Sequence, residues 1–250
     1  MILFLFNKNV KTRRIERGSM RHRAELAMQP IYNYDTGTVE YIEVLIRGYK
    51  GMDNVKDILN SVQSTGTEKQ FDIDVLVETL NVIKGVGIKA PVCVNLCPNT
   101  LACKGIGALI LKIIDKYGVE RSQIVIEANE LTDFSNMNVQ CNLDTLHSNN
   151  VKIALDDFGS GKTTLLCLVY NEFDIIKIDR AFITNDHWSN KEQMLRYVKR
   201  LVDGLKLQVI VEGIETLQRL KEVRQLGFGT VQGYIYHRPM LVSELRKVNC

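Results

Sequence analysis

The stretch Ile153-Ala-Leu-Asp156-Asp157-Phe-Gly159-Ser-Gly161-Lys162-Thr163-Thr164 places two adjacent carboxylates between an apolar run and a glycine-rich turn. Neighbouring carboxylates repel each other and are costly to bury unless something compensates their charge. A pair of divalent metal ions is the usual compensation, and one carboxylate can bridge both ions. From these residues alone an Asx-type turn capped by Asp157 explains the stretch equally well. The choice depends on whether similar residues recur along the chain.

The segment Gly159-Ser-Gly161-Lys162-Thr163 is similar to the end of a phosphate-binding P-loop. That loop needs a glycine five places before Gly161, where this chain has Asp156. Two acids at the loop entrance would also repel a phosphate group. The sequence therefore argues against an ATP or GTP site.

Outside this stretch, the chain begins with a hairpin and continues with alternating strand-like and helix-like segments. Two strands are predicted at 25–32 and 38–47, and the turn between them is too short for a parallel crossover, so they should be antiparallel. The later strands are predicted at 91–97, 123–127, 151–156, 174–179, 207–212 and 229–233. Helices are predicted at 53–64, 70–84, 106–117, 138–149, 163–170, 190–205 and 216–226.

This order of segments predicts an α/β fold with eight strands. Alternation of strands and helices implies parallel strands joined by right-handed crossovers. Eight strands in about 220 residues fit a modified (β/α)8 TIM-type barrel with one antiparallel strand, which comes from the first hairpin. A doubly wound open sheet is the alternative.

Polar residues recur near the C-terminal ends of the predicted strands, where such a barrel carries its chemistry. In most strands the polar residue lies two positions after an apolar one, so both side chains should face the barrel interior. A strand-end or helix-capping role explains any one of these polar residues. It does not explain why a polar residue occurs at the same place in strand after strand. The residues are Glu43, Arg47, Asn95, Glu127, Asp156, Lys177, Asp179, Glu212 and Gln232.

The barrel mouth would therefore collect hard oxygen ligands without cysteine or histidine. Glu43, Asn95, Glu127, Glu212 and the aspartate pair suit Mg²⁺ or Mn²⁺ rather than zinc. Lys177 and Arg47 add positive charge for a phosphate group. This set predicts a phosphodiester hydrolase with two metal ions about 3.5–4 Å apart.

The composition is that of a soluble globular protein and favours one domain. The chain has 250 residues, is 45% hydrophobic and has only four prolines. Residues 1–24 hold seven of the 32 basic residues and one of the 29 acidic residues, so 25 basic and 28 acidic residues remain. The basic charge is thus local to the N-terminus, and we expect no nucleic-acid partner.

The cysteines and the N-terminal residues bear on location. None of the six cysteines forms a CxxC pair, which predicts free thiols in a reducing cytoplasm. The apolar run of residues 1–6 is too short to span a bilayer, and its basic residues follow it rather than precede it, so we expect neither a transmembrane segment nor a signal peptide. A first strand, a docking arm or a weak membrane contact all remain open for this run.

Several short motifs in order resemble the EAL-domain family of cyclic-di-GMP phosphodiesterases. The resemblance runs from about Arg23 to Val248. The motifs are Gln29-Pro30-Ile31, Glu43-Val44-Leu45-Ile46-Arg47, Asn95, Glu127 with Glu130, Asp156-Asp157-Phe158-Gly159, Lys177-Ile178-Asp179, Glu212-Gly213-Ile214-Glu215 and Gln232-Gly233-Tyr234.

The resemblance implies metal-dependent hydrolysis of cyclic di-GMP to linear pGpG. By similarity, Glu43, Asn95, Glu127 and Asp156 would bind one Mg²⁺ or Mn²⁺ ion, and Asp156, Asp157 and Glu212 would bind the second. Lys177 would position or deprotonate the attacking water, so Lys177, Glu43 and Glu212 form the expected catalytic set. Gln29, Arg47, Asp179 and Gln232 form the expected substrate-binding set, and Glu130 would steady the loop after the aspartate pair.

Two positions depart from the family pattern. The signature has Val44 where the family usually has alanine, and by parity this side chain points away from the metal ions. The loop has Lys162 where the family usually has an aromatic residue. Because the resemblance associates that loop with dimer contacts and metal-site order, the change bears on regulation more than on chemistry.

The resemblance also implies a domain organisation, and two alternatives to an active phosphodiesterase remain. We expect a basic arm at residues 1–22 and an EAL phosphodiesterase domain at 23–250, in a stand-alone protein that forms homodimers. A catalytically silent relative that binds cyclic di-GMP or a partner protein is one alternative, although such relatives lack metal ligands and this chain has them all. An unrelated α/β metal-dependent hydrolase is the other.

Overall fold

The computed structural model describes residues 24–159, 165, 167–184 and 190–242. The proposed arm at 1–22 and most of the loop that contains Lys162 lie outside the described residues. Within the described part, no helix is both long enough and apolar enough to cross a membrane.

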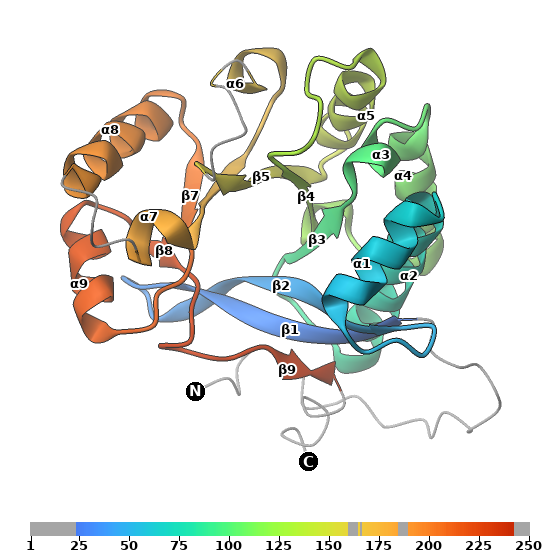
Figure 1. Cartoon of the computed structure of the whole chain (residues 1–250), viewed down its shortest axis with the longest axis horizontal. Helices are drawn as coiled ribbons and strands as arrows, with labels where there is room; N and C mark the ends of the chain where they lie inside the picture. Colours follow the sequence, from blue (N-terminus) through green and yellow to red (C-terminus); the bar gives the residue numbers. More distant parts are fainter. Residues whose placement is uncertain (1–23, 160–164, 166, 185–189, 243–250) are drawn as a thin grey trace.

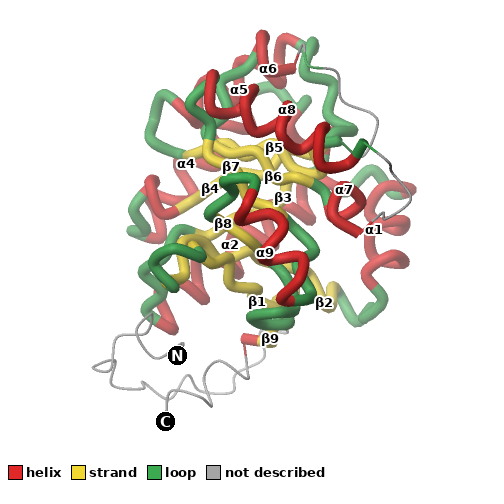
Figure 2. The backbone as a smooth tube through the Cα atoms, turned by 90° about the vertical axis from the view of Figure 1, so that its left-hand side faces the viewer, coloured by secondary structure: helices red, strands yellow, loops and turns green. Residues whose placement is uncertain are grey.

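The chain folds into a closed barrel surrounded by helices, as Figure 1 and Figure 2 show. Strand β1 (Ala24–Asn33) turns back as β2 (Thr38–Tyr49), and the two pair antiparallel with Gln29 opposite Glu43. The turn forms because Asn33 Oδ1 accepts the backbone N–H groups of Asp35 and Thr36.

The remaining barrel strands run parallel to β2 in chain order. They are β3 (Val92–Leu96), β4 (Ile124–Asn129), β5 (Lys152–Phe158), β6 (Ile175–Ile178), β7 (Gln208–Val211) and β8 (Thr230–Val231). Strand β1 closes the barrel between β8 and β2 and is antiparallel to both. The predicted modified barrel with one antiparallel strand is therefore confirmed, and the open sheet is excluded.

A ninth strand was not predicted from the sequence. Strand β9 (Met240–Leu241) pairs antiparallel with Ala27 and Met28 of β1, outside the barrel. A strand of two residues is too short to show an alternation of apolar and polar side chains, so the sequence pattern could not predict it. It forms because this segment pairs with β1.

Most predicted helices occur with shifts of a few residues at their ends. The structure has α1 (Val55–Ser64), α2 (Glu68–Val86), α3 (Pro98–Leu101), α4 (Ile106–Tyr117), the 3₁₀ helix η1 (Arg121–Gln123), α5 (Met137–His147), α6 (Cys167–Tyr170), α7 (Arg180–Thr184), α8 (Lys191–Gly204) and α9 (Leu217–Gln225). The short α3 and α7 were not predicted. Capping marks several ends: Asn54 accepts two N–H groups at the start of α1, and Gly87 ends α2 with a left-handed backbone.

The period-two alternation of the strands separates two apolar layers. One layer fills the barrel interior and consists of Ile31, Tyr41, Cys93, Val125, Ala154, Ile175 and Ile210. The alternate residues, such as Val94, Ile126 and Val211, face outward and belong to the larger core with the helices. Val44 belongs to this outer core, so it points away from the barrel interior.

Candidate active site

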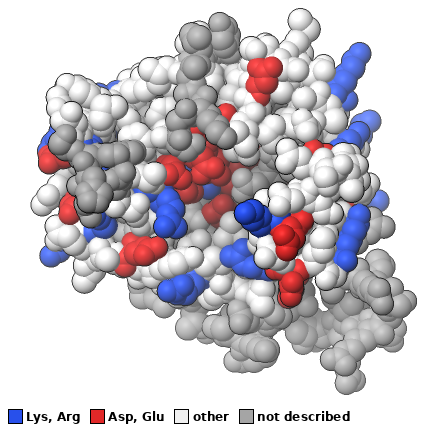
Figure 3. All heavy atoms as spheres, viewed as in Figure 1, with Lys and Arg blue, Asp and Glu red and all other residues white. Residues whose placement is uncertain are grey.

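The centre of the barrel mouth is an ammonium group surrounded by carboxylates. Lys177 Nζ lies 2.8 Å from Glu212 Oε1, 2.9 Å from Glu127 Oε1, 3.0 Å from Asp156 Oδ1 and 3.4 Å from Glu43 Oε1. Each of these residues lies two positions beyond a member of the inner apolar layer, so strand alternation alone brings them together. Figure 3 shows acidic side chains in a hollow of this face, with basic side chains around its rim.

Burial and mutual repulsion change the protonation of this cluster. Burial opposes the charge of Lys177, but the four carboxylates outweigh it and hold its pKa well above the ordinary value. Burial raises the pKa of Glu212 to about 8, against the opposing effect of Lys177. The pKa of Glu127 is also raised well above its ordinary value, mainly by burial. The site thus holds more acidic groups than one ammonium can compensate.

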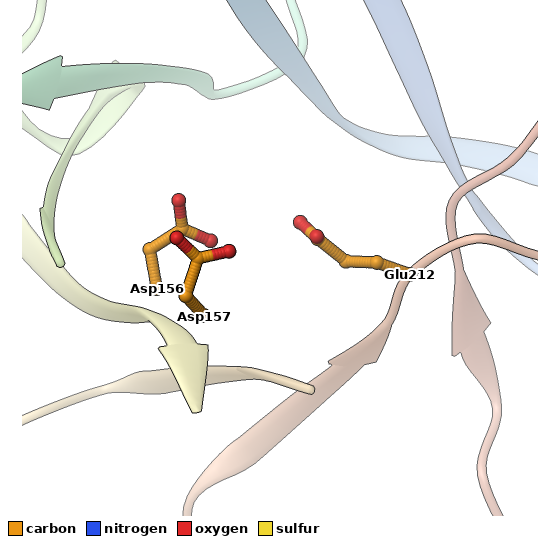
Figure 4. A group of neighbouring side chains, drawn as sticks. All are labelled: Asp156, Asp157 and Glu212. Carbon is orange, nitrogen blue, oxygen red and sulfur yellow. The ribbon is translucent and has the colours of Figure 1, made fainter. Parts of the chain in front are cut away.

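A second group of carboxylates overlaps the first. Asp156, Asp157 and Glu212 each offer an oxygen within 4.8 Å of the others, and Figure 4 shows the two aspartates facing Glu212 across the mouth. The strand pairing is irregular between Leu155 and Phe158, and Asp157 has a positive φ of 58°. This backbone lets both aspartates reach the mouth. Burial, followed by the charges of Asp156 and Asp179, raises the pKa of Asp157 to about 6.

Gly159, which follows the aspartate pair by two residues, is held by Glu130. Gly159 N donates to Glu130 Oε1 at 2.7 Å, and Glu130 is buried. Gly159 has φ +92°, and a Cβ there would lie 1.8 Å from Cε2 of Phe182. Only glycine fits this position. Lys162 lies outside the described residues, so its proposed pairing with Glu130 stays a prediction.

Two amide side chains contact the carboxylates, and a third contacts one of these amides. Asn95 is exposed at the mouth and donates through Nδ2 to Glu127 Oε2 at 2.9 Å, which turns its Oδ1 away from Glu127. Gln232 donates to Glu43 Oε2 and, at 3.2 Å, to Gln29 Oε1. Both glutamines are buried.

The other two residues of the expected substrate-binding set lie at strand ends with local contacts. The Arg47 guanidinium donates to the carbonyl oxygen of Ile46 at 2.8 Å and is half-buried. Asp179 Oδ1 accepts the N–H of Ala181 at 2.7 Å in the first turn of α7 and is also half-buried. The structure therefore brings the carboxylates and Lys177 together, and leaves Arg47 and Asp179 outside the charge cluster.

The donor set fits divalent cations. Lys177 Nζ lies 2.9 and 3.0 Å from Glu127 Oε1 and Asp156 Oδ1, yet these buried oxygens accept no well-formed hydrogen bond from the described residues. Buried carboxylate oxygens without donors are the groups that a hard cation satisfies. All the converging ligands are oxygens, which favours Mg²⁺, Mn²⁺ or Ca²⁺ over zinc.

One residue that supports the site was not predicted from the sequence. Asp72 of α2 is buried and accepts the N–H of Cys97 at 2.8 Å and its thiol at 3.3 Å. It thereby anchors the start of α3, two residues after Asn95. An acidic residue on the apolar face of the predicted helix 70–84 was the available signal.

The chain is similar to a family of known proteins. Residues 12–239 match the EAL domain family. The probable cyclic di-GMP phosphodiesterase PdeA of Escherichia coli is 29% identical over 224 residues, which make up 88% of this chain and 31% of PdeA. The cyclic di-GMP phosphodiesterase PdeL of the same organism is 25% identical over 230 residues, or 88% of this chain and 63% of PdeL. The chain thus spans less than two thirds of either relative.

Solved structures share the fold. The PaMucR phosphodiesterase in complex with c-di-GMP superposes with a TM-score of 0.81 at 26% identity, over 89% of this chain and 99% of that one. Klebsiella pneumoniae BlrP1 in its pH 9.0 complex with manganese and cyclic di-GMP gives a TM-score of 0.79 at 25% identity, over 88% of this chain and 57% of that one. Because the family match extends over most of its length, this chain belongs to the EAL domain family.

Proposed function

We propose that this chain hydrolyses cyclic di-GMP to linear pGpG with two Mg²⁺ or Mn²⁺ ions. The observation that carries the proposal is the convergence of Glu43, Glu127, Asp156 and Glu212 on one point of the barrel mouth, around Lys177 Nζ. The names of PdeA and PdeL and the ligand of the PaMucR structure support the choice of substrate.

The carboxylates divide into two overlapping ligand sets. Glu43, Asn95, Glu127 and Asp156 would hold one ion, and Asp156, Asp157 and Glu212 would hold the other. The ions would polarise a phosphoryl oxygen and lower the pKa of bound water. The manganese in the BlrP1 structure supports an ion of this class.

We assign the activation of the attacking water to Lys177. Its ammonium is fully buried and reaches the carboxylates of both ligand sets. Cations among these carboxylates would oppose its charge and lower its pKa. Lys177 then donates a hydrogen bond to the water, or accepts its proton, while the water attacks phosphorus and the ribose O3′ leaves as a hydroxyl with the proton that the water gives up. The ring opens at one phosphodiester, and the product is linear.

The substrate contacts come from the rim. Arg47 supplies a guanidinium for a substrate phosphate, and Asp179 supplies an acceptor for a guanine N–H group. Gln29 and Gln232 line the wall between β1 and β8.

We also propose that the domain spans 23–250, acts in the cytoplasm and forms homodimers. The five described cysteines are free thiols, which supports a reducing compartment. Four exposed apolar side chains follow β4 and β5, namely Leu131, Met137, Leu165 and Val169. The segments that carry them pack together through Phe134 and Phe173, whose ring centroids are 5.4 Å apart. Light scattering at micromolar concentration tests the dimer.

The test of the function compares the parent with Glu43→Ala. We expect the parent to convert cyclic di-GMP to pGpG with Mg²⁺, and Glu43→Ala to lose nearly all turnover because one metal ligand is gone. A parent protein that binds cyclic di-GMP with Mg²⁺ present but never cleaves it would be a receptor, which contradicts the proposal.

A further inference from the structure

A chain of amide hydrogen bonds joins Glu43 to the backbone of the C-terminal segment. Gln232 Nε2 donates to Glu43 Oε2 and to Gln29 Oε1, and Gln29 Nε2 donates to the carbonyl oxygen of His237 at 3.1 Å. We call these three side chains and that carbonyl the amide relay. Gln29 and Gln232 are 6% and 5% exposed, so water competes little for their groups.

The direction of the relay is fixed at its far end. The His237 carbonyl can only accept, so Gln29 must present its NH₂ group there and its oxygen to Gln232. Gln232 must then present its NH₂ group to both Gln29 and Glu43. If either amide were reversed, two acceptors would face each other in a buried site, which is costly. The backbone carbonyl of residue 237 therefore favours the orientation in which Gln232 presents its NH₂ group to Glu43.

The position of Gln232 is fixed by the strand next to it. Gln232 N donates to Val211 O at 2.9 Å, and Gln232 O accepts from Ile214 N at 3.1 Å, on either side of Glu212. A Cβ at Gly233 would lie 2.0 Å from Ile214 O, so the backbones touch here. Gln232 thus contacts the segment of one proposed ligand through its backbone and the carboxylate of another through its side chain.

The segment that contains His237, whose carbonyl is the last acceptor of the relay, is held along β1. We call residues 233–241 the strap. Tyr236 stacks on Tyr32 with centroids 4.5 Å apart, Ile235 N donates to Ile214 O at 3.1 Å, and β9 pairs with β1. These contacts on both sides of residue 237 hold its carbonyl beside β1.

We propose that Gln29 and Gln232 are positioning residues that orient Glu43 for metal binding, with the strap as the fixed end of the relay. Because Gln232 holds Oε2 of Glu43, Oε1 is the oxygen turned toward Lys177, 3.4 Å away, and toward the other carboxylates. Hydrogen bonds behind a metal ligand commonly change metal affinity by about 10–100-fold when they are removed. The inference rests on the proposed function for the role of Glu43, and it gives Gln29 a role behind the metal site in addition to its expected place in the substrate-binding set.

The relay is tested by Mn²⁺ binding to the protein without substrate, followed by the electron paramagnetic resonance signal of free Mn²⁺. Gln29→Met keeps the shape but removes both hydrogen bonds, and Gln232→Ala removes the donor to Glu43. We expect the Kd for Mn²⁺ to rise about 10-fold in Gln29→Met and by at least the same factor in Gln232→Ala. Because Gln29 acts through Gln232, the double variant should bind like Gln232→Ala alone. Gln193→Met, an exposed change of the same kind on α8, should bind like the parent.

Parent-like Mn²⁺ binding by Gln29→Met, together with a raised KM for cyclic di-GMP, would overturn the proposal and make Gln29 a substrate contact. Strictly additive losses in the double variant would also overturn it. If Gln29→Met fails to fold, Gln29→Asn replaces it, since asparagine stays polar but is one methylene too short to reach both partners. Failure of the parent to cleave cyclic di-GMP while it binds Mn²⁺ would count against the proposed function alone, because the titration contains no substrate.

Discussion

Lys177 Nζ lies 2.9 Å from Glu127 Oε1, and neither side chain reaches solvent. A buried ion pair of this kind is costly unless further groups compensate it. Here three further carboxylates share the ammonium, so the cluster carries excess negative charge that divalent cations would neutralise. The pair is therefore better explained by a metal site than by a need for stability.

Lys177→Met should separate chemistry from metal binding. The change removes the group beside the attacking water, so kcat should fall about 100-fold while KM for cyclic di-GMP changes little. Mn²⁺ should bind at least as tightly as in the parent, because the ammonium no longer competes for the carboxylates. Steady-state kinetics and Mn²⁺ titration measure the two effects. A parent-like kcat would show that the role assigned to Lys177 is wrong.

Glu130→Ala should loosen the loop after Asp156 and Asp157. It removes the acceptor of Gly159 N, so we expect Mn²⁺ affinity to fall about 10-fold. Lys162→Ala should weaken affinity less, because it leaves the hydrogen bond from Gly159 N to Glu130 in place. Mn²⁺ titration of both single variants and the double variant checks this. Additive effects would exclude pairing between Lys162 and Glu130.

The sequence predicted the barrel and its charged mouth because both follow from strand alternation. Ala154 and Asp156, or Ile175 and Lys177, share a face wherever the strand is placed, so their convergence needed only the barrel closure. The relay from Glu43 to His237 could not be predicted this way. It joins positions about 200 residues apart through side-chain rotamers, and one partner is a backbone carbonyl that leaves no trace in the sequence.

The stability of the protein should depend on the ionisation of Asp72. Burial raises its pKa from 3.8 to about 6, so its contribution to stability is fully present below about pH 4 and is lost as pH rises through about 6. The loss is on the order of 3 kcal/mol. Relative to the parent, Asp72→Asn should thus gain stability between pH 4 and pH 7. Urea unfolding at several pH values measures this, with the exposed Asp53→Asn as control. A constant difference between Asp72→Asn and parent would contradict the assignment.

Deletion of residues 1–22 should leave a folded, active protein. The described barrel begins with β1 at Ala24, and it closes through the pairing of β1 with β2 and β8. Circular dichroism and turnover of the truncated chain should match those of the full chain. Insoluble protein after the deletion would show that the arm packs as part of the fold.

Product analysis of one reaction tests the central claim most directly. The purified chain is incubated with cyclic di-GMP and Mg²⁺, and in parallel with excess EDTA, and the nucleotides are separated by chromatography. The oxygen-only ligand set predicts linear pGpG with Mg²⁺ or Mn²⁺, little product with Ca²⁺ because its looser shell misplaces the water, and none with EDTA. Full conversion in EDTA, or no pGpG in any metal, would contradict a metal-dependent phosphodiesterase at this mouth.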